Sequence, residues 1–437
     1  DCRVHIKTDK GLNKPIHVGR GVRHGDPMSP MFNAVIDMVV GGIDGSIGVT
    51  GDEQSQTKCN YAAFADDLLL MSGTDIGMQV LLQQLETAMA DVGLVMNPAK
   101  CASMRTEVIS RNKLWIVNPE PYLKVQATEV KALSIIDTYR YLGVQIGPRM
   151  EFVSVTEKIQ KSLHSISRAP LKPCQRLYIL RTHLIPSLVH YLTFERISLG
   201  SLTSADVEIR SFLRRWLRLP KDTPNAFFHT PVRLGGLGIL QLRRWIPEIR
   251  IKRLTNVLQM AKKKNDIFMQ DVLGSNTAIM GEIRKFGTNR TKNTPNVALG
   301  LRTAEVLYKT VDGYGLRQFC RGIGPGKWLI DGVDRMPADQ YLKCVRVRAA
   351  VLHNRLRSSR GKPLANTICD TGCQTLESLG YIIQNCPRTD GPRHTRHDSI
   401  VKMLSEALIK KSYSTVLEFR IPTVEGTKIP DICDWEK

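Results

Sequence analysis

The sequence predicts a mixed α/β (α+β) region at its N-terminal side, then a helix-rich basic region and a small cysteine-containing module. Three observations carry this prediction: two short apolar runs flank a pair of aspartates, amphipathic helical patterns surround that pair, and basic residues accumulate after residue 100. A length of 437 residues suggests roughly three domains.

The segment Asn60–Ser72 places two adjacent aspartates, Asp66 and Asp67, between two apolar runs. The runs Tyr61–Phe64 and Leu68–Met71 predict short buried strands joined by a tight turn. Adjacent exposed carboxylates repel each other, whereas carboxylate oxygens suit Mg²⁺, and two ions about 3.5–4 Å apart assist an in-line phosphoryl displacement. The alternative is an ordinary hairpin with an acidic turn, because aspartate is a common turn residue.

A glycine-rich basic loop, Gly19–Pro30, precedes the first predicted helix. Ser29 is expected as its N-cap, Pro30 as its first residue and Gly41–Gly42 as its end. The glycines do not match the dinucleotide-binding fingerprint, so the loop favours close approach of the backbone to a nucleic acid. The apolar stripe of this helix consists of Phe32, Val35, Ile36, Val39 and Val40.

A second amphipathic helix is expected to end at Gly93, and two short segments of interest follow it. One segment is Gly93–Cys101, which contains an Asn-Pro pair and Lys100. The other is Tyr141–Val144, with the sequence Tyr-Leu-Gly-Val. The apolar stripe of the helix consists of Ile76, Val80, Leu81, Leu85, Met89 and Val92.

These segments together resemble the palm of reverse transcriptases. The glycine-rich loop, the Phe-Ala-Asp-Asp hairpin, the Gly…Asn-Pro…Lys segment and Tyr-Leu-Gly-Val follow the order and spacing of that family. There they are the template-contacting loop, the catalytic hairpin, a segment with a lysine near the incoming nucleotide, and the primer grip. The Ala-Asp-Asp form is similar to the non-LTR (LINE-type) branch. The resemblance implies catalytic roles for Asp66, Asp67 and Lys100, and nucleic-acid or nucleotide contacts for Gly25, Asp26, Pro27, Ser29 and Asn33.

Two further segments, Leu219–His229 and Gly235–Ile239, resemble the region after the thumb in site-specific (type I) elements. These elements carry a restriction-enzyme-like endonuclease and insert into large-subunit ribosomal RNA genes. The resemblance covers nearly the whole chain. It implies a palm in 1–150, a helix-rich basic thumb in 151–260, a basic linker region in 261–360 with an expected loop at Gly313–Gly326, and a zinc-knuckle-like segment with the beginning of an endonuclease in 361–437.

The charge of the chain is unevenly distributed. The 62 Lys and Arg and 41 Asp and Glu give a net charge of +21, yet residues 1–100 contain 8 basic and 12 acidic residues. The excess of basic residues after residue 100 predicts binding of a polyanion, and nucleic acid is favoured over a membrane surface. No run of about 18 apolar residues and no signal peptide is visible, so a membrane protein is not expected.

Two basic segments are candidate contacts to nucleic acid. In the first, Arg210, Arg214 and Arg218 recur at every fourth residue opposite an apolar surface, which predicts an arginine row that faces phosphates. The second, Tyr341–Lys362, includes Arg346 and Arg348 among seven basic residues and contains no acidic residue. A solvated charged face is the alternative for each segment.

The ten cysteines are mostly scattered, which predicts reduced thiols. The exception is a set of three at zinc-knuckle spacing, Cys369, Cys373 and Cys386. The family carries a Cys-Cys-His-Cys zinc knuckle here, but Tyr381 stands at the position of the histidine. Because a structural zinc site needs four ligands, His394 and His397 are the candidates for the fourth. Otherwise the knuckle is degenerate and binds zinc weakly or not at all.

Both ends of the sequence suggest a piece of a larger polyprotein. Arg420–Asp431 resembles the opening of the family's endonuclease site, in which Asp431 would be the first metal-binding acid. Glu436 and Lys437 lie too close to it to supply the further acid and lysine. The family's palm has another aspartate and its fingers upstream of the stretch that this sequence begins with. The sequence as it stands is therefore expected not to polymerise.

The resemblance implies an RNA-directed DNA polymerase with an attached endonuclease, two Mg²⁺ ions at the palm and a nuclear location. Its expected partners are the element RNA as template, dNTPs, and target DNA in a ribosomal RNA gene, where synthesis begins at the nick. One alternative is a non-catalytic nucleic-acid-binding protein from a decayed element copy, which the departure at Tyr381 favours. Another is a cellular relative, such as an intron maturase or telomerase, against which the post-thumb and knuckle segments argue.

Overall fold

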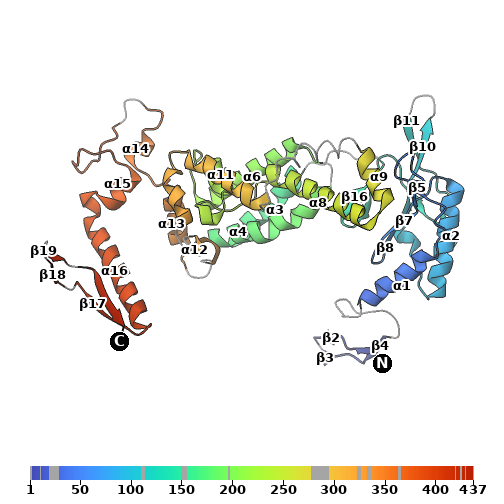
Figure 1. The fold of residues 1–437 in the computed structure, drawn as a ribbon, viewed down its shortest axis with the longest axis horizontal. Helices are drawn as coiled ribbons and strands as arrows, with labels where there is room; N and C mark the ends of the chain where they lie inside the picture. Colours follow the sequence, from blue (N-terminus) through green and yellow to red (C-terminus); the bar gives the residue numbers. More distant parts are fainter. Residues whose placement is uncertain are drawn as a thin grey trace. The chain divides into compact units, whose positions relative to one another are not determined.

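The computed structural model describes residues 2–9, 11–18, 29–109, 114–148, 155–194, 197–276, 295–321, 326–331, 336–362, 366–418, 420–423, 426–428 and 430–436 (Figure 1). The chain forms two compact units. Unit 1 comprises Asp1–Arg168, Tyr178–Ile209 and Leu240–Leu299, and unit 2 comprises Ala169–Leu177, Arg210–Ile239 and Gly300–Lys437. The chain therefore passes from one unit to the other and back before either is complete.

The first core of unit 1 lies between helices α1 (Ser29–Gly41) and α2 (Asp75–Asp91). Both helices end where the sequence predicts, and Thr74 caps α2 by accepting a hydrogen bond from the backbone N–H of Gly77 at 3.1 Å. Ile76 is 76% exposed in the first turn of α2, so its predicted place in the apolar stripe is wrong. The buried side chains of this core are Ile36, Val39, Val40, Ile43, Leu81 and Leu85.

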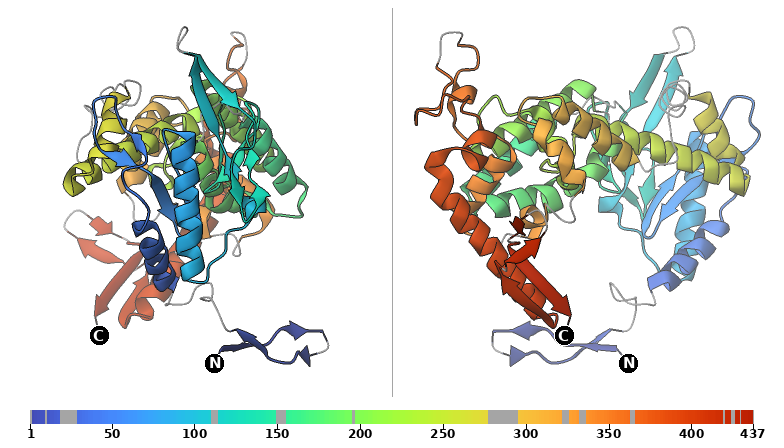
Figure 2. Two further views of the ribbon diagram at one scale, coloured as in Figure 1. Left: turned by 90° about the vertical axis from the view of Figure 1, so that its right-hand side faces the viewer. Right: turned by 60° about the vertical axis from the view of Figure 1, so that its left-hand side comes forward.

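The described strands of unit 1 pair two by two, and all pairs are antiparallel except β9 with β14. The hairpin β7–β8 that carries the two aspartates is therefore an antiparallel pair to which no other described strand is added, and it lies in the blue part of the ribbon (Figure 2). The strands are β1 (Cys2–Val4), β2 (Lys7–Thr8), β3 (Gly11–Leu12), β4 (Ile16–Val18), β5 (Val49–Thr50), β6 (Lys58–Cys59), β7 (Tyr61–Phe64), β8 (Asp67–Leu70), β9 (Ala102–Ser103), β10 (Arg105–Ile109), β11 (Leu114–Asn118), β12 (Lys124–Val125), β13 (Thr128–Glu129), β14 (Lys131–Ala132), β15 (Tyr139–Tyr141) and β16 (Val144–Ile146).

The rest of unit 1 is helical, as expected for the region after residue 150. Two polar contacts fix its helices. The buried carboxylate of Asp206 accepts hydrogen bonds from the backbone N–H groups of Leu242 (2.9 Å) and Arg243 (3.1 Å) at the start of α8. Arg250 donates to the last carbonyls of α5. The helices are α3 (Thr156–Arg168), the π-helical turn η2 (Leu180–Leu184), α5 (Ile185–Phe194), α8 (Leu242–Lys264) and α9 (Ile267–Ser275), while α4 (Pro173–Ile179) and α6 (Leu199–Leu217) each belong partly to both units.

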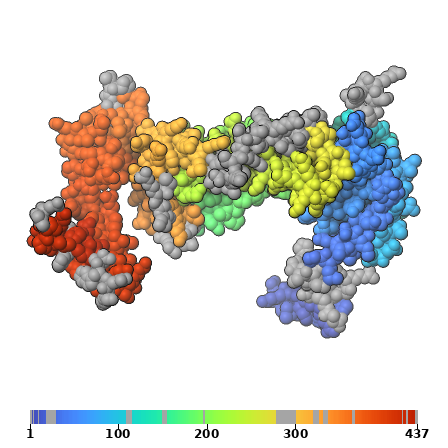
Figure 3. All heavy atoms as spheres, in the orientation of Figure 1, coloured from blue at the N-terminus to red at the C-terminus, as the bar shows by residue number. Residues whose placement is uncertain are grey.

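Helix α9 packs on the N-terminal part of unit 1 at Gly51. Yellow and blue atoms of this unit lie against each other in Figure 3. A Cβ atom at Gly51 would lie 2.7 Å from the carbonyl oxygen of Phe268, so a side chain does not fit there. The Ser275 hydroxyl donates to the Gly51 carbonyl at 3.5 Å. Sequence positions more than 200 residues apart are therefore joined within this unit.

Unit 2 is mostly helical and ends in four short strands. The predicted loop Gly313–Gly326 is wrong in part, because residues 314–321 form a 3₁₀ helix. The elements are α7 (Asn225–His229), the 3₁₀ helices η3 (Val232–Leu234), η4 (Tyr314–Arg321) and η5 (Pro387–Thr389), helices α11 (Pro295–Tyr308, begun in unit 1), α12 (Lys327–Asp331), α13 (Ala338–Arg348), α14 (Arg355–Ser358), α15 (Leu379–Gln384) and α16 (Asp390–Ile409), and strands β17 (Tyr413–Leu417), β18 (Ile421–Thr423), β19 (Gly426–Lys428) and β20 (Ile432–Glu436).

The core of unit 2 gathers around the segment after α6. The side chains of Phe227, Phe228 and Tyr341 are at most 1% exposed. Gly236 approaches Thr230 so closely that a Cβ atom would lie 2.2 Å from the Thr230 carbonyl oxygen. This glycine is therefore required by packing. Among the described helices of the whole chain, none combines the length and the apolar character needed to cross a membrane.

Candidate active site and metal cluster

The two aspartates lie at the turn of the hairpin β7–β8. The predicted tight turn is present, but it is one residue shorter than Ala65–Asp67: Phe64 pairs with Asp67, so Ala65 and Asp66 form the turn and Asp67 begins β8. Ala65 has a φ of +52°, a left-handed conformation that is sparsely populated for residues other than glycine. Both carboxylates are exposed, and no hydrogen bond or ion pair joins either of them to another described residue.

Packing on the α1–α2 core sets the direction of this hairpin. Because side chains alternate along a strand, Leu68 and Leu70 face inward together with Tyr61 and pack on that core, while Asp67 and Leu69 face outward. The strands are therefore half-covered rather than buried as predicted: Phe64 is 65% and Leu69 41% exposed. The physical reason is that no other described strand pairs with β7 or β8.

The Tyr-Leu-Gly-Val segment forms a second tight hairpin. Its turn residues Leu142 and Gly143 have φ values of +48° and +80°, which a two-residue turn between β15 and β16 requires. The Nε2 atom of His190 on α5 lies 2.9 Å from the Leu142 carbonyl oxygen and donates a hydrogen bond to it. Partial burial, with the nearby negative charge of Asp67, raises the pKa of Tyr141. The second hairpin is therefore close to the acidic turn.

Lys100 ends a short 3₁₀ helix, η1 (Pro98–Lys100). The Asn97 side chain begins this helix by accepting a hydrogen bond from the Ala99 N–H at 3.1 Å. The hydroxyl of Tyr139 on β15 donates to the Lys100 carbonyl at 2.5 Å. Strand β15 therefore contacts the lysine segment through Tyr139 and lies near Asp67 through Tyr141. Three of the four sequence segments predicted to form the site come together here.

The fourth segment is the glycine-rich loop. Gly25, Asp26 and Pro27 lie outside the described residues, and so does the side chain of Ser29. Asn33 is exposed on α1, away from the buried stripe of that helix. The resemblance implies nucleic-acid or nucleotide contacts for these four residues and for Asn33. Of the five, the structure describes the side chain of Asn33, which is accessible.

The structure does not form the predicted arginine row on α6. Arg210 is 9% exposed, and its Nη1 lies 3.1 Å from Nε2 of His229. Since a guanidinium only donates, Nε2 of His229 accepts, and its Nδ1–H donates to the Ile239 carbonyl at 3.0 Å. Arg214 donates to the Thr223 carbonyl at 3.2 Å and to the Asn225 side chain at 2.8 Å. Of the row, only Arg218 is an exposed residue.

Arg348 is also not a surface residue. It is 5% exposed and donates to the carbonyls of Gly235 (2.9 Å), Val232 and Gly236 (3.4 Å). It therefore stabilises the turn after η3, and its predicted contact with nucleic acid stays a prediction. Arg346 is half-buried on the same helix, α13.

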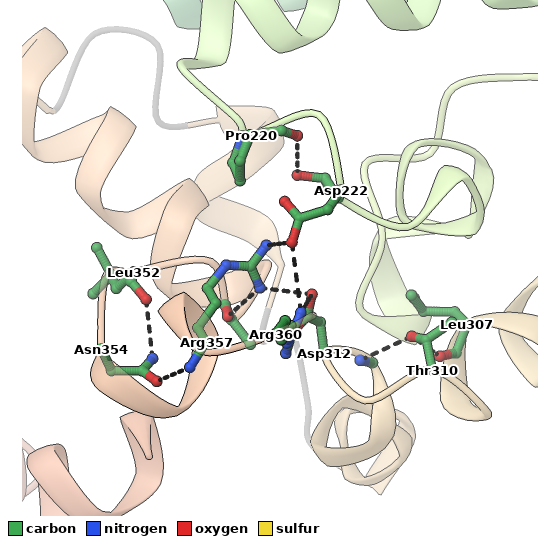
Figure 4. Close-up of polar contacts among 12 residues, drawn as sticks. Pro220, Asp222, Leu307, Thr310, Asp312, Leu352, Asn354, Arg357 and Arg360 are labelled. Atoms are coloured by element: carbon green, nitrogen blue, oxygen red, sulfur yellow. Dashed lines mark hydrogen bonds and ion pairs between the residues drawn. The ribbon is translucent and has the colours of Figure 1, made fainter. Parts of the chain in front are cut away.

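The segment Tyr341–Lys362 contains no acidic residue, but in the fold acidic residues from other segments pair with its arginines. Arg357 lies between Asp312 (2.7 Å) and Asp222 (2.6 Å), as Figure 4 shows. Arg360 pairs with Asp312 at 2.6 Å. The partners are 45 to 135 residues away in sequence. Much of this basic segment thus serves ion pairs within unit 2.

The three knuckle cysteines form a compact cluster. The Sγ atoms of Cys369 and Cys386 are 3.8 Å apart, and all three sulfurs lie within 4.8 Å of one another. Cys369 and Cys386 are buried, and Cys373 is half-buried. Hydrogen bonds from Thr371 and Tyr381 lower the pKa of Cys373, which favours its thiolate, while the contact with Cys373 raises the pKa of Tyr381 to about 12.

Neither candidate histidine belongs to this cluster. His394 is 74% exposed, and its Nε2 lies 3.7 Å from the carboxylate of Asp390. His397 lies 3.1 Å from Asp431 and 3.2 Å from Asp398. The prediction of His394 as a fourth ligand is therefore wrong among the described residues, because α16 directs both histidines to acidic partners. Asp431, just before β20, is in turn 63% exposed beside His397.

Comparison with known proteins identifies the family. Residues 3–146 match the family model described as "Reverse transcriptase (RNA-dependent DNA polymerase)". A Pol polyprotein from the type-1 retrotransposable element R2 of Popillia japonica is 30% identical over 430 residues, which cover 96% of this chain and 67% of that protein. The chain belongs to the R2 retrotransposon Pol polyproteins. This confirms the resemblance that its motifs predict.

Two longer R2 relatives align over almost the whole chain. The Nasonia vitripennis R2 Pol polyprotein is 33% identical over 99% of the chain, and the Drosophila melanogaster protein from element R2DM is 32% identical over 94%. The chain spans about two fifths of these two relatives, 41% and 39% of their lengths. It is thus similar to a contiguous part of an R2 Pol polyprotein.

Sequence reasoning missed several residues that shape these sites. Tyr139, His190 and Thr371 have no motif of their own, and each is defined by a contact that depends on the fold. Thr371 had a weak signal, since it lies between two cysteines of the knuckle. For His190, 48 residues from Leu142, the sequence of this R2 chain offers no signal at all.

Proposed function

We propose that this chain is the polymerase part of an RNA-directed DNA polymerase with an attached endonuclease, which copies its own element RNA. The observation that carries the proposal is the exposed pair Asp66 and Asp67. The strands beneath them are held on the α1–α2 core, while the acids face outward with no counter-charge among the described residues. Keeping two like charges adjacent costs free energy, and two bound divalent cations would remove that cost.

The donor set fits two Mg²⁺ ions, because both residues supply carboxylate oxygens at an accessible turn. When bound, the ions lower the pKa of an attacking hydroxyl and neutralise the triphosphate and the leaving pyrophosphate. Asp66 and Asp67 would hold the ions. Lys100 steadies or protonates the leaving group, and Tyr139 fixes the backbone of Lys100. The Tyr141–Val144 hairpin positions the end of the primer.

The partners that we propose are the element RNA as template, dNTPs, and target DNA in a ribosomal RNA gene. Synthesis begins at a nick in that DNA, and this requires a nuclear location. The net charge of +21 supports binding to nucleic acid, since each neutralised phosphate makes the salt dependence of binding steeper by about one unit of log–log slope. We further propose that Asp431 belongs to the endonuclease and that the three-cysteine cluster binds Zn²⁺.

Primer extension on an RNA template with Mg²⁺ tests the polymerase. The full-length protein that contains this chain is compared with its Asp66→Ala/Asp67→Ala variant. We expect extension by the parent and none by the variant, because the variant lacks the carboxylates that hold both ions. Equal extension by the two proteins would show that the hairpin is ordinary structure.

The chain offers a matched control in a second pair of adjacent exposed acids, Asp52 and Glu53. The variant Asp52→Ala/Glu53→Ala removes the same charge from the same unit and is expected to extend primers like the parent. If both double variants lose activity, the loss reports net charge or folding, and the assignment to Asp66 and Asp67 fails.

A non-catalytic nucleic-acid-binding protein from a decayed element copy is the second candidate. The observation in its favour is Tyr381, which replaces a histidine of the family's knuckle. This candidate predicts that the folded parent binds RNA but does not extend a primer. The same assay therefore separates the two functions.

A further inference from the structure

The three knuckle thiols have the spacing of a tetrahedral zinc site. An ion with Zn–S distances of about 2.3 Å holds its sulfurs about 3.8 Å apart. The Sγ atoms of Cys369 and Cys386 are 3.8 Å apart, and all three sulfurs lie within 4.8 Å of one another. The donor set therefore fits Zn²⁺ in three of its four positions.

Acidic and imidazole side chains near the cluster are engaged elsewhere. Asp370 pairs with Arg388 at 3.0 Å and with Arg355 at 3.4 Å. Glu377 accepts from the Arg355 backbone N–H at 3.0 Å and pairs with Arg388 at 3.3 Å. His394 faces Asp390 from α16. Asp370 and Glu377 lie within 4.8 Å of the Cys369 sulfur, but either would give up its ion pair with Arg388 to bind the ion, and His394 would give up Asp390.

The Thr371 hydroxyl, in contrast, faces all three sulfurs. Its Oγ1 lies 2.9 Å from Cys369, 3.1 Å from Cys373 and 3.7 Å from Cys386. The Tyr381 hydroxyl contacts Cys373. Three thiolates and Zn²⁺ carry one net negative charge, so a neutral oxygen ligand adds none, whereas a phenolate would add a second. Tyr381 is therefore suited to donate a hydrogen bond to the Cys373 thiolate and not to bind the ion.

We propose that this chain has replaced the family's Cys-Cys-His-Cys zinc site by a three-thiolate site whose fourth ligand is the Thr371 hydroxyl oxygen, with Tyr381 as a hydrogen-bond donor to Cys373. The inference goes beyond the proposed polymerase function and does not depend on it. It assigns the Tyr381 departure a physical meaning: the histidine is absent because an oxygen two residues after the first cysteine takes its place.

Titration of the apo chain with Co²⁺, followed by its displacement with Zn²⁺, tests the ligand set without any enzymatic readout. Tetrahedral Co²⁺ absorbs in the visible region, and thiolate ligands add charge-transfer bands that scale with their number. We expect one ion per chain, bands of three thiolates, and a d–d spectrum with an oxygen rather than a nitrogen as fourth donor. Absence of a tetrahedral spectrum in the folded chain would overturn the proposal.

Three variants locate the fourth ligand. Thr371→Val keeps the shape of the side chain but removes the hydroxyl, and we expect at least about a tenfold loss of metal affinity with an altered d–d spectrum. Thr371→Ser keeps the hydroxyl and should retain both. His394→Ala, the matched control, should bind like the parent. An unchanged Thr371→Val, or a weakened His394→Ala, would refute the assignment.

Two substitutions at residue 381 test the role of the tyrosine. Tyr381→Phe removes the hydrogen bond to Cys373 and should weaken metal binding by about 10–100-fold, the usual effect of losing a partner of a ligand. Its d–d spectrum should stay that of the parent, because the ligands are unchanged. A changed donor set in Tyr381→Phe would mean that the phenol itself binds the ion. Far-UV circular dichroism of each apo variant establishes that it is folded.

Discussion

Two groups of charged side chains look alike in the sequence and differ in the fold. Asp66 and Asp67 have no basic residue beside them in the sequence, and Arg357 and Arg360 have no acidic one. In the fold the two acids remain exposed without a partner among the described residues, whereas the arginines pair with Asp312 (Figure 4). A local excess of charge therefore indicates a binding site only where folding brings no counter-charge to it.

The contrast between the exposed acids and the paired arginines would not hold if Asp66 and Asp67 stabilised the fold. In the full-length protein that contains this chain, we expect Asp66→Asn/Asp67→Asn to lower polymerisation by about 10²–10³-fold or more, since it removes several kcal/mol of metal-dependent stabilisation. The free energy of unfolding should change by no more than about 0.5 kcal/mol, because neither side chain has a partner to lose. Urea unfolding of the same preparations measures the second quantity. A large loss of stability would place the acids with the structural charges.

Breaking the ion pairs of Arg357 and Arg360 should instead lower the stability of the fold. Asp312 has a side chain that is 5% exposed, and Asp312→Ala leaves the guanidinium of Arg357 without its buried partner. We expect a loss of about 3 kcal/mol in the free energy of unfolding, at the low end for a broken buried pair because Arg360 is 39% exposed. Urea unfolding of the chain measures it.

The control for this change is Asp222→Ala, which removes a second acid from the same arginines. The side chain of Asp222 is 53% exposed, so its loss should cost less than about 1 kcal/mol. Equal losses for the two variants would show that the burial of Asp312 does not matter.

The pH dependence of stability sharpens the contrast further. Burial raises the pKa of Asp312, but hydrogen bonds from Arg360 and Arg357 and their positive charges outweigh it and lower the pKa below 3.8. A carboxyl group with a lowered pKa in the folded state stabilises the fold above its unfolded-state pKa, and this contribution is lost as the pH falls through the folded-state value. Unfolding followed between pH 6 and pH 3 should therefore show a loss of stability in acid that Asp312→Asn lacks.

His190 gives the smallest expected effect. Its hydrogen bond to the Leu142 carbonyl holds the hairpin turn of β15–β16, and it is itself exposed. His190→Ala should lower kcat for primer extension by about tenfold through misplacement of the primer end, with little change in the affinity for the template–primer duplex. His190→Gln keeps a donor and should recover part of the rate, and His183→Ala is the control. A loss of duplex affinity with kcat unchanged would contradict this positioning role.

Local patterns predicted local structure well. Helices α1 and α2 follow from apolar stripes that end at or near a glycine, although Ser29 is the first residue of α1 and not its N-cap, and the hairpin β7–β8 follows from two short apolar runs around a turn. The clustering of three cysteines follows from their spacing. In each of these cases the interactions that decide the structure join residues close together in the chain.

The failures come from contacts between distant residues. The arginine row on α6 does not form, because folding brings His229 to Arg210. In the basic segment Tyr341–Lys362, folding brings Asp312 and Asp222 to Arg357. The choice of His394 as a zinc ligand was wrong because it relied on the spacing from Cys386 in the sequence. The direction of helix α16 decides what the side chain faces, and it faces Asp390. The domain boundaries and the roles of the site residues stay predictions, because geometry without a bound nucleic acid or metal does not test them.

The interleaving of the two units has a consequence during synthesis on the ribosome. The amide groups that Asp206 caps belong to residues made 36 positions later, after the segment Arg210–Ile239 of unit 2 has emerged. At about 5–20 residues per second, the buried carboxylate waits about 2–7 seconds for its partners. Until then α6 lacks the start of α8 against which it is fixed. The nascent chain thus exposes an unfinished helical region for seconds, and a chaperone that covers it has that interval in which to act.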